Sequence, residues 1–343
     1  MTGLPPSDLE PWQEPVRGGP ADPAALRLTG MAQLRGIRDG RLRAPSNARL
    51  TGRRLTQIGR RSVTFTMPAS PWFAGPKGMI HPGVLVLLGD SALTGAVLTS
   101  VPPGVLFSTA EMSMTFLAEM PVPGGELTAR ASVLHSAGRH GLAIAEMTGP
   151  AGELLGFGTS RVFLQPPMDV SGLPQLAPPT PEPEWDTPDP WARPLTPPAS
   201  VVVPATTDGL EVLSRAAQGE RPRPPIDRLL GIRVTRAERG GITFSMPASE
   251  WLANELGTVS GGCLGLLAES ATSAAGQSLA RPGSGYRALD VKINFLAQVP
   301  PDGDDIVAQG RALHQGKLVV ATTEVTHQGK LVAIATGSTV MGD

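Results

Sequence analysis

Residues 83–96 read GVLVLLGDSALTGA, and residues 262–275 read GCLGLLAESATSAA. Both stretches are apolar at almost every position, and each carries one carboxylate, Asp90 in the first and Glu269 in the second. A helix that is apolar on nearly all sides is buried rather than amphipathic. We therefore expect each stretch to form a buried central helix that carries a single acidic side chain.

The two stretches belong to a longer repeat. Further matching segments stand 179 residues apart, namely SVTFTMPASPWF (62–73) with GITFSMPASEWL (241–252) and MTFLAEMP (114–121) with INFLAQVP (293–300). The same offset holds without a gap from Gly40 to His135 of the first copy. Self-similarity of this kind identifies a tandem duplication, here of a domain of roughly 130 residues.

Each copy shows the same order of predicted elements. A polar helix (about 24–40, or 208–218) precedes a strand that ends at MPAS, the central helix follows, and three or four strands with alternating apolar residues complete the copy. A buried helix followed by antiparallel strands indicates a sheet that wraps around that helix. The sequence therefore predicts an α+β fold with two antiparallel sheets, each wrapped around a central helix.

Prolines set the predicted domain boundaries. Residues 166–205 are so rich in proline that they cannot form a regular helix or sheet, because each proline lacks a backbone N–H. Trp185 and Trp191 lie in this stretch, and the sequence leaves open whether they dock on a domain or stay exposed. In chain order we expect an irregular tail (1–22), a first domain (23–165), a proline-rich linker (166–205) and a second domain (206–343).

Composition argues against several classes of function. The formal net charge is −1, and no basic run is present that could bind the phosphates of a nucleic acid. The single cysteine, Cys263, excludes an intramolecular disulfide framework, and the low count of cysteine and histidine predicts no metal site. The sequence shows no secretory leader and no run of about 18 apolar residues, so we expect a cytoplasmic protein without a membrane partner.

The residues that precede the two central helices differ in hydrogen-bonding capacity. The N-terminus of a helix exposes unpaired N–H groups at the positive end of the helix dipole, which suits a developing oxyanion. Gly261 offers such an N–H without a side chain to block a ligand, whereas Pro82 at the equivalent position has none. The alternative interpretation is that both stretches are only tight turns into a helix.

The carboxylates of Asp90 and Glu269 should be paired or have a functional role, since burying an unpaired carboxylate destabilises the fold. The alternative is that they lie on a solvated face or cap a helix. Eight residues separate Gly261 from Glu269, which is about 12 Å along a helix. A carboxylate that acts beside the Gly261 N–H must therefore come from elsewhere in the fold.

With these elements the chain resembles the hotdog-fold acyl-CoA thioesterases, and among them the PaaI-like group. The pattern of that group is an Asn, then a His-Gly-Gly at the helix start, then an Asp or Glu about two turns into the helix. Copy two has Asn254, Ser260-Gly261-Gly262 and Glu269 at these positions, and copy one has Gly75, His81-Pro82-Gly83 and Asp90. Each copy thus departs from the pattern, and in different places.

The resemblance implies that the central helices pair in antiparallel orientation, so that each helix start meets the carboxylate of the other copy. It also implies a supporting Ser or Thr on the following strand, where copy one has Thr109 and copy two has Ala288. The retained features then fall in one composite site, with the catalytic residues Asp90, Thr109, Asn254 and Gly261 and the substrate-binding residues Ser260 and Gly262. The other site, with Glu269, His81 and Gly83, is expected to be degenerate.

The function that the resemblance implies is hydrolysis of an acyl-CoA thioester, with CoA as part of the substrate and no other cofactor. The chain is expected to contain a complete pair of domains, and association of two such chains into a homodimer is left open. Two alternatives remain. One is a non-catalytic acyl-CoA-binding or regulatory protein, and the other is a hotdog dehydratase or hydratase in which His81 would face Glu269.

Overall fold

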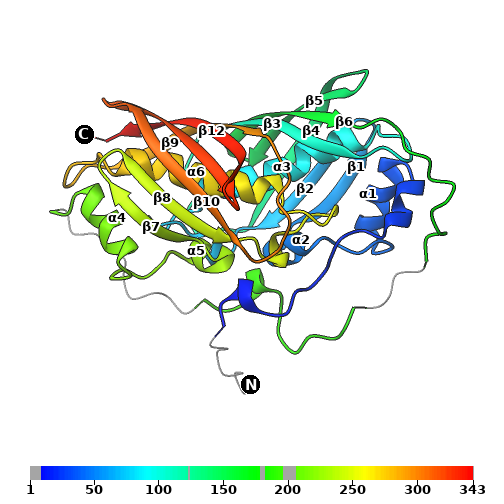
Figure 1. Cartoon of the computed structure of the whole chain (residues 1–343), viewed down its shortest axis with the longest axis horizontal. Coiled ribbons are helices and arrows are strands. Elements are labelled where there is room, and N and C mark those ends of the chain that lie inside the picture. Colours follow the sequence, from blue (N-terminus) through cyan, green and yellow to red (C-terminus); the bar gives the residue numbers. More distant parts are fainter. Residues whose placement is uncertain (1–8, 123, 178–181, 196–205, 343) are drawn as a thin grey trace.

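The computed structural model describes residues 9–122, 124–177, 182–195 and 206–342 (Figure 1). The elements of copy one are α1 (Gly30–Arg38), α2 (Ser46–Thr51), β1 (Arg54–Gly59), β2 (Ser62–Pro68), α3 (Pro82–Leu98), β3 (Phe107–Phe116), β4 (Glu126–Ala137), β5 (His140–Thr148) and β6 (Leu154–Leu164). Those of copy two are α4 (Gly209–Ala217), α5 (Pro225–Leu230), β7 (Arg233–Glu238), β8 (Gly241–Pro247), α6 (Gly261–Gln277), β9 (Tyr286–Phe295), β10 (Asp305–His314), β11 (Leu318–His327) and β12 (Lys330–Met341). Short 3-10 helices are η1 (Pro11–Gln13), η2 (Pro23–Arg27), η3 (Pro71–Phe73), η4 (Pro190–Ala192) and η5 (Glu250–Leu252).

The strands form one continuous antiparallel sheet of 12 strands, in the order β1-β2-β4-β5-β6-β3-β9-β12-β11-β10-β8-β7. Strands β3 and β9 join the two copies at its centre, where Glu111 lies opposite Asn294 and Thr115 lies opposite Asp290. The expectation of two separate sheets is corrected by this pairing. An edge strand presents a row of unpaired backbone groups, and here the edge of each copy satisfies that of the other. The two copies therefore pair within one chain.

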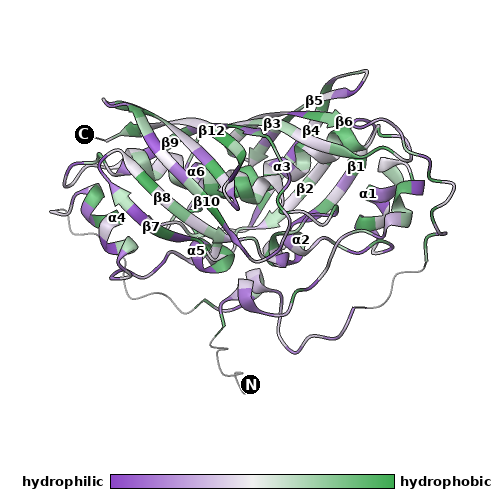
Figure 2. Cartoon of the chain, viewed as in Figure 1, coloured by the Kyte–Doolittle hydropathy of each residue, from purple (hydrophilic) through white to green (hydrophobic). Residues whose placement is uncertain are grey.

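The central helices α3 and α6 lie side by side against this sheet (Figure 1). Almost every side chain of both helices is buried, as expected from their uniformly apolar sequences. Along the strands, in contrast, buried and less buried residues alternate, as in β5. Figure 2 shows the same alternation of hydrophobic and hydrophilic residues along the strands of copy two. A two-residue period places one face of the sheet on the helices and the other face outward.

Helices α3 and α6 pack closely in antiparallel orientation. Gly83, near the start of α3, faces Leu266, and Gly262, near the start of α6, faces Leu87. A Cβ at Gly83 would lie 3.0 Å from the Cα of Leu266, and a Cβ at Gly262 would lie 2.8 Å from the Cα of Leu87. The two backbones approach this closely only because neither glycine carries a side chain. These contacts fix the register between the two copies.

The N-terminal segment and the linker contain a further repeat that docks on the domains. Residues 10–15 (EPWQEP) and 189–194 (DPWARP) again stand 179 apart, and they include η1 and η4. On copy one, Ser70 Oγ donates to the Trp191 carbonyl at 2.6 Å, and Trp72 Nε1 donates to the Arg193 carbonyl at 3.1 Å. Trp191 therefore docks on a domain.

The same bonds recur on copy two with the segments exchanged. Ser249 Oγ donates to the Trp12 carbonyl at 3.1 Å, and Trp251 Nε1 donates to the Glu14 carbonyl at 2.9 Å. The segment that precedes copy one thus binds copy two, and the segment that precedes copy two binds copy one. Arg193 and its repeat counterpart Glu14 form an ion pair where the two segments meet. Regions that were expected to be irregular hold defined turns here, because hydrogen bonds to the domains fix them.

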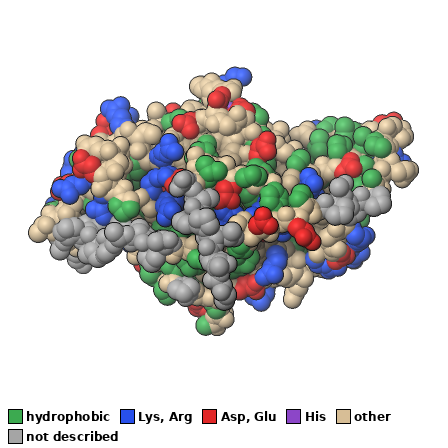
Figure 3. Space-filling view, turned by 90° about the horizontal axis from the view of Figure 1, so that it is seen from below, with side chains coloured by type: hydrophobic (Ala, Val, Ile, Leu, Met, Phe, Trp, Pro, Cys, Tyr) green, Lys and Arg blue, Asp and Glu red, His purple; other side chains and the backbone are tan. Residues whose placement is uncertain are grey.

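The exchanged segments lie on the lower face of the molecule in Figure 1, which Figure 3 shows from below. On this face acidic and basic side chains are interspersed.

Among the helices of the described residues, none combines the length and the hydropathy that a membrane span requires.

Gly265 of α6 tests how tightly the helix pair is packed. A Cβ there would lie 2.6 Å from Val86 Cγ1 and 2.9 Å from Ile293 Cδ1. Overpacking of this kind costs roughly 1–3 kcal/mol, which exceeds the roughly 0.5–1 kcal/mol that alanine gains over glycine inside a helix. Gly265→Ala should therefore lower the free energy of unfolding, as measured by urea denaturation.

Gly285→Ala is the control, because a Cβ at Gly285 would meet nothing within 4 Å. Its free energy of unfolding should stay within about 0.5 kcal/mol of the parent. If Gly265→Ala proved as stable as this control, the two helices would have room to separate and the packing argument would fail.

Candidate active site

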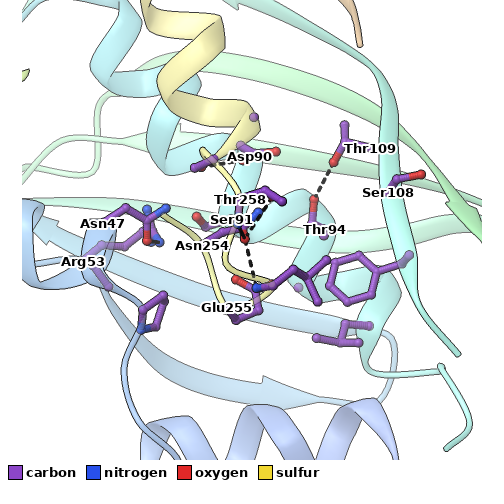
Figure 4. A pocket seen from close by; sticks show the side chains of 18 of the residues that line it. Asn47, Arg53, Asp90, Ser91, Thr94, Ser108, Thr109, Asn254, Glu255 and Thr258 are labelled. Carbon is purple, nitrogen blue, oxygen red and sulfur yellow. Dashed lines mark hydrogen bonds between the residues drawn. The ribbon is translucent and has the colours of Figure 1, made fainter. Parts of the chain in front are cut away.

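A cavity of about 1150 Å³ lies between the two copies at the start of α6 (Figure 4). Copy one contributes residues of α2, β1, α3 and β3, and copy two contributes the loop from 254 to 261. Small-molecule pockets have volumes of roughly 300–1000 Å³. The cavity is therefore large enough for a long organic ligand, and neither copy could form it alone.

Asp90 belongs to α3 of copy one, but its carboxylate lies at the N-terminus of α6 of copy two. Its Oδ2 accepts hydrogen bonds from the Gly262 N–H at 2.8 Å and from the Ser260 hydroxyl at 3.3 Å. Burial raises the pKa of Asp90, while the hydrogen bond from Gly262 and the positive charge of Arg53 act in the opposite direction. The geometry thus brings the carboxylate of one copy to the helix start of the other.

Gly261 is the first residue of α6, and its N–H has no acceptor among the described residues. A Cβ on Gly261 would lie 3.4 Å from Oδ1 of Asp90. That oxygen likewise has no donor within the described part of the chain, because both donors to Asp90 bind Oδ2. An unpaired N–H at the positive end of a helix dipole and an unpaired carboxylate oxygen therefore border the same space.

Asn254 lines the cavity and shapes the loop that leads into α6 (Figure 4). Its Oδ1 accepts from the Leu256 N–H at 2.9 Å, the Thr258 N–H at 3.2 Å and the Thr258 hydroxyl at 3.3 Å. Its side-chain N–H groups have no acceptor among the residues that the structure describes. They are therefore free to donate to a ligand. At the equivalent position of copy one, Gly75 lines a second cavity without a side chain.

Thr109 lines the first cavity but forms no hydrogen bond with Asp90. Its hydroxyl lies 3.2 Å from that of Thr94, which follows Asp90 by about one turn of α3 (Figure 4). Thr109 was expected to hold either the Asp90 carboxylate or the water; the donors to the carboxylate are Ser260 and Gly262, so the role toward the water is the one that stays a prediction. The partner of Thr109 could not be read from the sequence, since it depends on the register of β3 against α3.

Two polar residues of the cavity were not anticipated from the sequence. Arg53 and Asn47 are both buried, and Arg53 Nη2 donates to Asn47 Oδ1 at 2.9 Å. A signal for them exists in the repeat, because copy two has Ile232 and Ile226 at the equivalent positions. Copy two folds with a buried apolar residue at each of these positions, so the fold does not require the polar residue of copy one. The polar residue therefore indicates a functional role at that site.

The second cavity, of about 710 Å³, lies at the start of α3. His81 Nδ1 accepts from the Gly83 N–H at 3.1 Å and lies 3.5 Å from Glu269 Oε2. Ser273 donates to Glu269 Oε1, while Oε2 is buried with no hydrogen-bond partner in the described ranges. Burial lowers the pKa of His81, so the imidazole is neutral at pH 7. Pro82 supplies no N–H at this helix start.

Cys263 and metal binding offer no other centre among the described residues. Cys263 is fully buried, and burial raises the pKa of its thiol to about 12, so the nucleophilic thiolate does not form near pH 7. Within the described ranges, no group of three or more His, Cys, Asp and Glu side chains is placed to hold a metal ion.

The chain is similar to known proteins in sequence and in structure. Each copy matches the same family model, described as the thioesterase superfamily, over residues 77–144 and 256–326. A comparison with curated proteins gave no match. Among solved structures, the tesB protein of Mycobacterium avium subs paratuberculosis is 12% identical with a TM-score of 0.55, over 87% of this chain and 98% of that chain. A hot dog fold protein of Alicyclobacillus acidocaldarius is 16% identical with a TM-score of 0.51, over 84% and 96% of the two chains. At these identities the likeness shows the hotdog fold.

The raised pKa of Asp90 predicts how stability depends on pH. A carboxyl group with a higher pKa in the folded state binds more protons when folded. Its stabilising contribution is fully present below the ordinary Asp value of 3.8 and is lost as the pH rises through the folded pKa. Asp90→Asn removes this titration but keeps an acceptor oxygen. The variant should therefore be more stable than the parent at pH 7, with a difference that shrinks towards pH 4.

Urea denaturation of both proteins across this pH range measures the effect. A stability difference between parent and variant that grows as the pH falls would contradict the raised pKa.

Proposed function

We propose that this chain, in which each hotdog copy matches the thioesterase superfamily, hydrolyses acyl-CoA thioesters in the cavity at the start of α6. The observation that carries the proposal is the meeting of Asp90 from copy one with the Gly261 N–H from copy two. Thioester hydrolysis needs a donor for the carbonyl oxygen and a base or nucleophile beside it, and these two groups supply both. CoA takes part only as a portion of the substrate.

The Gly261 N–H donates to the thioester carbonyl oxygen in the proposed reaction. The dipole of α6 stabilises the negative charge that develops on this oxygen as the carbonyl carbon becomes tetrahedral. Collapse of the intermediate breaks the carbon–sulfur bond, and the CoA thiolate leaves and takes up a proton. A preorganised donor of this kind contributes roughly 10²–10³ in rate.

Asp90 activates the attacking group in one of two ways. As a general base, it takes a proton from water while the water oxygen bonds to the carbonyl carbon. As a nucleophile, it bonds to that carbon itself and gives a mixed anhydride, which water then hydrolyses. Both routes use the unpaired Oδ1, while Oδ2 stays held by Gly262 and Ser260. Its raised pKa makes the carboxylate more basic, which favours either route.

The other expected site residues take supporting roles in this proposal. Asn254 orients the water or the carbonyl through its unpaired side-chain N–H groups. Thr109, paired with Thr94, lines the path of the substrate. Ser260 and Gly262 hold the carboxylate of Asp90 rather than the substrate. The grouping of these residues around the first cavity supports the proposed reaction.

Hydration of an enoyl thioester in the second cavity is the second candidate function. His81 Nδ1 and Glu269 Oε2 lie 3.5 Å apart, which is the imidazole–carboxylate pair that this chemistry uses. The Nδ1 lone pair, however, already accepts the Gly83 N–H and caps α3. His81 therefore acts first as the cap of α3, and we assign catalysis to the first cavity.

One assay separates the three functions. Thiol release from a panel of saturated acyl-CoAs at neutral pH identifies hydrolysis. Consumption of an enoyl-CoA without thiol release identifies hydration. Binding of acyl-CoA without either reaction identifies a non-catalytic acyl-CoA-binding protein.

Asp90→Asn and Glu269→Gln form a matched pair, because they change equivalent positions of the two copies. Asp90→Asn should lower kcat at least ~100-fold, on the scale of a lost general base. Glu269→Gln should change kcat little, because Pro82 leaves its cavity without an oxyanion donor. Thiol release measures both variants. Equal losses would refute the assignment to one cavity, and an unimpaired Asp90→Asn would refute the role of Asp90.

Gly261→Pro tests the oxyanion donor by giving copy two the residue that copy one has at Pro82. Ser260 has φ −61° and ψ 139°, close to the φ −66° and ψ 132° of His81, so proline fits at this first helical position. Turnover should fall ~10²–10³-fold with little change in Tm. Pro82→Gly, the reverse change, should leave turnover near that of the parent. A folded Gly261→Pro chain with the parental rate would remove Gly261 from the mechanism.

A further inference from the structure

Arg53 is a buried cation in the proposed catalytic cavity. The residue is 7% exposed, and Nη2 donates to Asn47 Oδ1 at 2.9 Å. Nε and Nη1 are buried, and neither has an acceptor among the described residues. A guanidinium that has lost its hydration is costly to the fold unless an anion or a full set of acceptors replaces the water. This group therefore points to a ligand that brings an anion with it.

The carboxylates of the same cavity do not supply that anion. Burial lowers the pKa of Arg53, and its interactions with Cys263, Glu255 and Asp90 act in the opposite direction with smaller effect. Asp90 is held at the start of α6 by Gly262 and Ser260 instead. Among the ion pairs of the described residues, none includes Arg53. The guanidinium of Arg53 is thus buried in the cavity without a directly bonded carboxylate among the described residues.

The duplicated copy shows that the fold does not require this charge. Copy one has Asn47, Thr51 and Arg53 where copy two has Ile226, Leu230 and Ile232, and all six residues are buried. The polar cluster is also braced, since Thr51 Oγ1 donates to the Asn47 carbonyl at 2.7 Å and the Asn47 N–H donates to the Ala253 carbonyl of copy two at 3.1 Å. The guanidinium is therefore held in place, although an isoleucine would fill the same position of the fold.

We propose that Arg53 binds a carboxylate at the distal end of the acyl group, so that the preferred substrates are CoA thioesters of dicarboxylic acids. This inference rests on the proposed function and names its substrate class. Figure 4 shows Arg53 and Asn47 together on one side of the cavity, apart from Asp90, and all three residues line it. An acyl group bound in this cavity would therefore meet Asp90 with its thioester and Arg53 with its distal end. Guanidinium groups bind carboxylates through strong charge-assisted hydrogen bonds.

A phosphate of CoA is the other possible source of the anion. The burial of Arg53 favours the acyl carboxylate. The phosphates of CoA carry a bulky nucleotide, which has to stay near the mouth of a cavity. Arg53 is almost fully enclosed, which suits the part of the substrate that enters completely. The two sources are distinguished by thioesters of N-acetylcysteamine, which have no phosphate.

The test compares kcat/KM for matched pairs of thioesters, such as butyryl with succinyl and hexanoyl with adipoyl, on CoA and on N-acetylcysteamine. The parent should prefer the carboxyacyl member of a pair, and the best chain length reports the reach from Asp90 to Arg53. Arg53→Ile, which copies Ile232, should lower kcat/KM for carboxyacyl thioesters roughly 10–100-fold, the scale of a lost charge-assisted hydrogen bond. The decisive quantity is the ratio of kcat/KM within a pair, because an effect of the lost charge on Asp90 acts on alkyl and carboxyacyl thioesters alike. This ratio should fall by the same factor, and Arg53→Lys should restore part of the preference.

Arg130→Met is the control for the loss of one positive charge, because Arg130 lies on the exposed side of β4. It should change neither member of a pair. If Arg53→Ile lowered alkyl and carboxyacyl CoA thioesters equally and left N-acetylcysteamine thioesters unaffected, Arg53 would serve a CoA phosphate and the proposal would be overturned. A parent without preference between the members of any pair would overturn it as well.

A different result would show that the chain is not a thioesterase. A parent that releases no thiol from any thioester contradicts the hydrolase assignment. In that case calorimetric titration with adipate and with hexanoate still tests Arg53 directly. Selective binding of the dicarboxylate by the parent, lost in Arg53→Ile, would support the role of Arg53, and equal or absent binding of both acids would exclude it.

Discussion

The antiparallel contact between α3 and α6 is the constraint on which the other features of this molecule depend. Gly83 and Gly262 let the two backbones approach, and their contacts with Leu266 and Leu87 set the register. In that register the carboxylate of one helix lies at the N-terminus of the other. A single helix could not achieve this, because eight residues along it span about 12 Å. The composite cavity is therefore a direct consequence of how the helices pack.

Duplication supplies two equivalent cavities, and the residues that line them differ. The cavity at the start of α6 has a helix N–H at Gly261 and a held carboxylate at Asp90. The cavity at the start of α3 has Pro82 at the helix start, and a neutral imidazole occupies its capping position. Buried polar groups destabilise a fold unless they are paired. Both cavities hold buried polar groups, and they differ in which ones: the first combines Asp90 with the N-terminus of α6, whereas the second combines Glu269 with the His81 cap of α3.

Segments from one copy hold parts of the other throughout the chain. The Ala21 N–H donates to the Glu255 carbonyl, and the Asn47 N–H donates to the Ala253 carbonyl, so backbone of copy one supports the loop that carries Asn254. The exchanged segments around Trp12 and Trp191 add contacts of the same kind. Together with the pairing of β3 and β9, these bonds make the two copies one structural unit. The cavity between the copies is therefore bordered by elements that hydrogen bonds join across the two copies.

The sequence by itself determined the duplication, the α+β class, the two buried helices and the contrast between Gly261 and Pro82. These features are local, because the apolar pattern of a helix and the absence of an N–H in proline do not depend on distant residues. The repeat of EPWQEP in DPWARP was also present in the sequence, but proline-rich composition made it look like a linker. Only the tertiary structure decided that β3 joins β9, that Thr109 pairs with Thr94, and that Arg53 lies buried beside the cavity. Each of these depends on the register at which two surfaces meet, and sequence periodicity shows which residues are buried without showing what they are buried against.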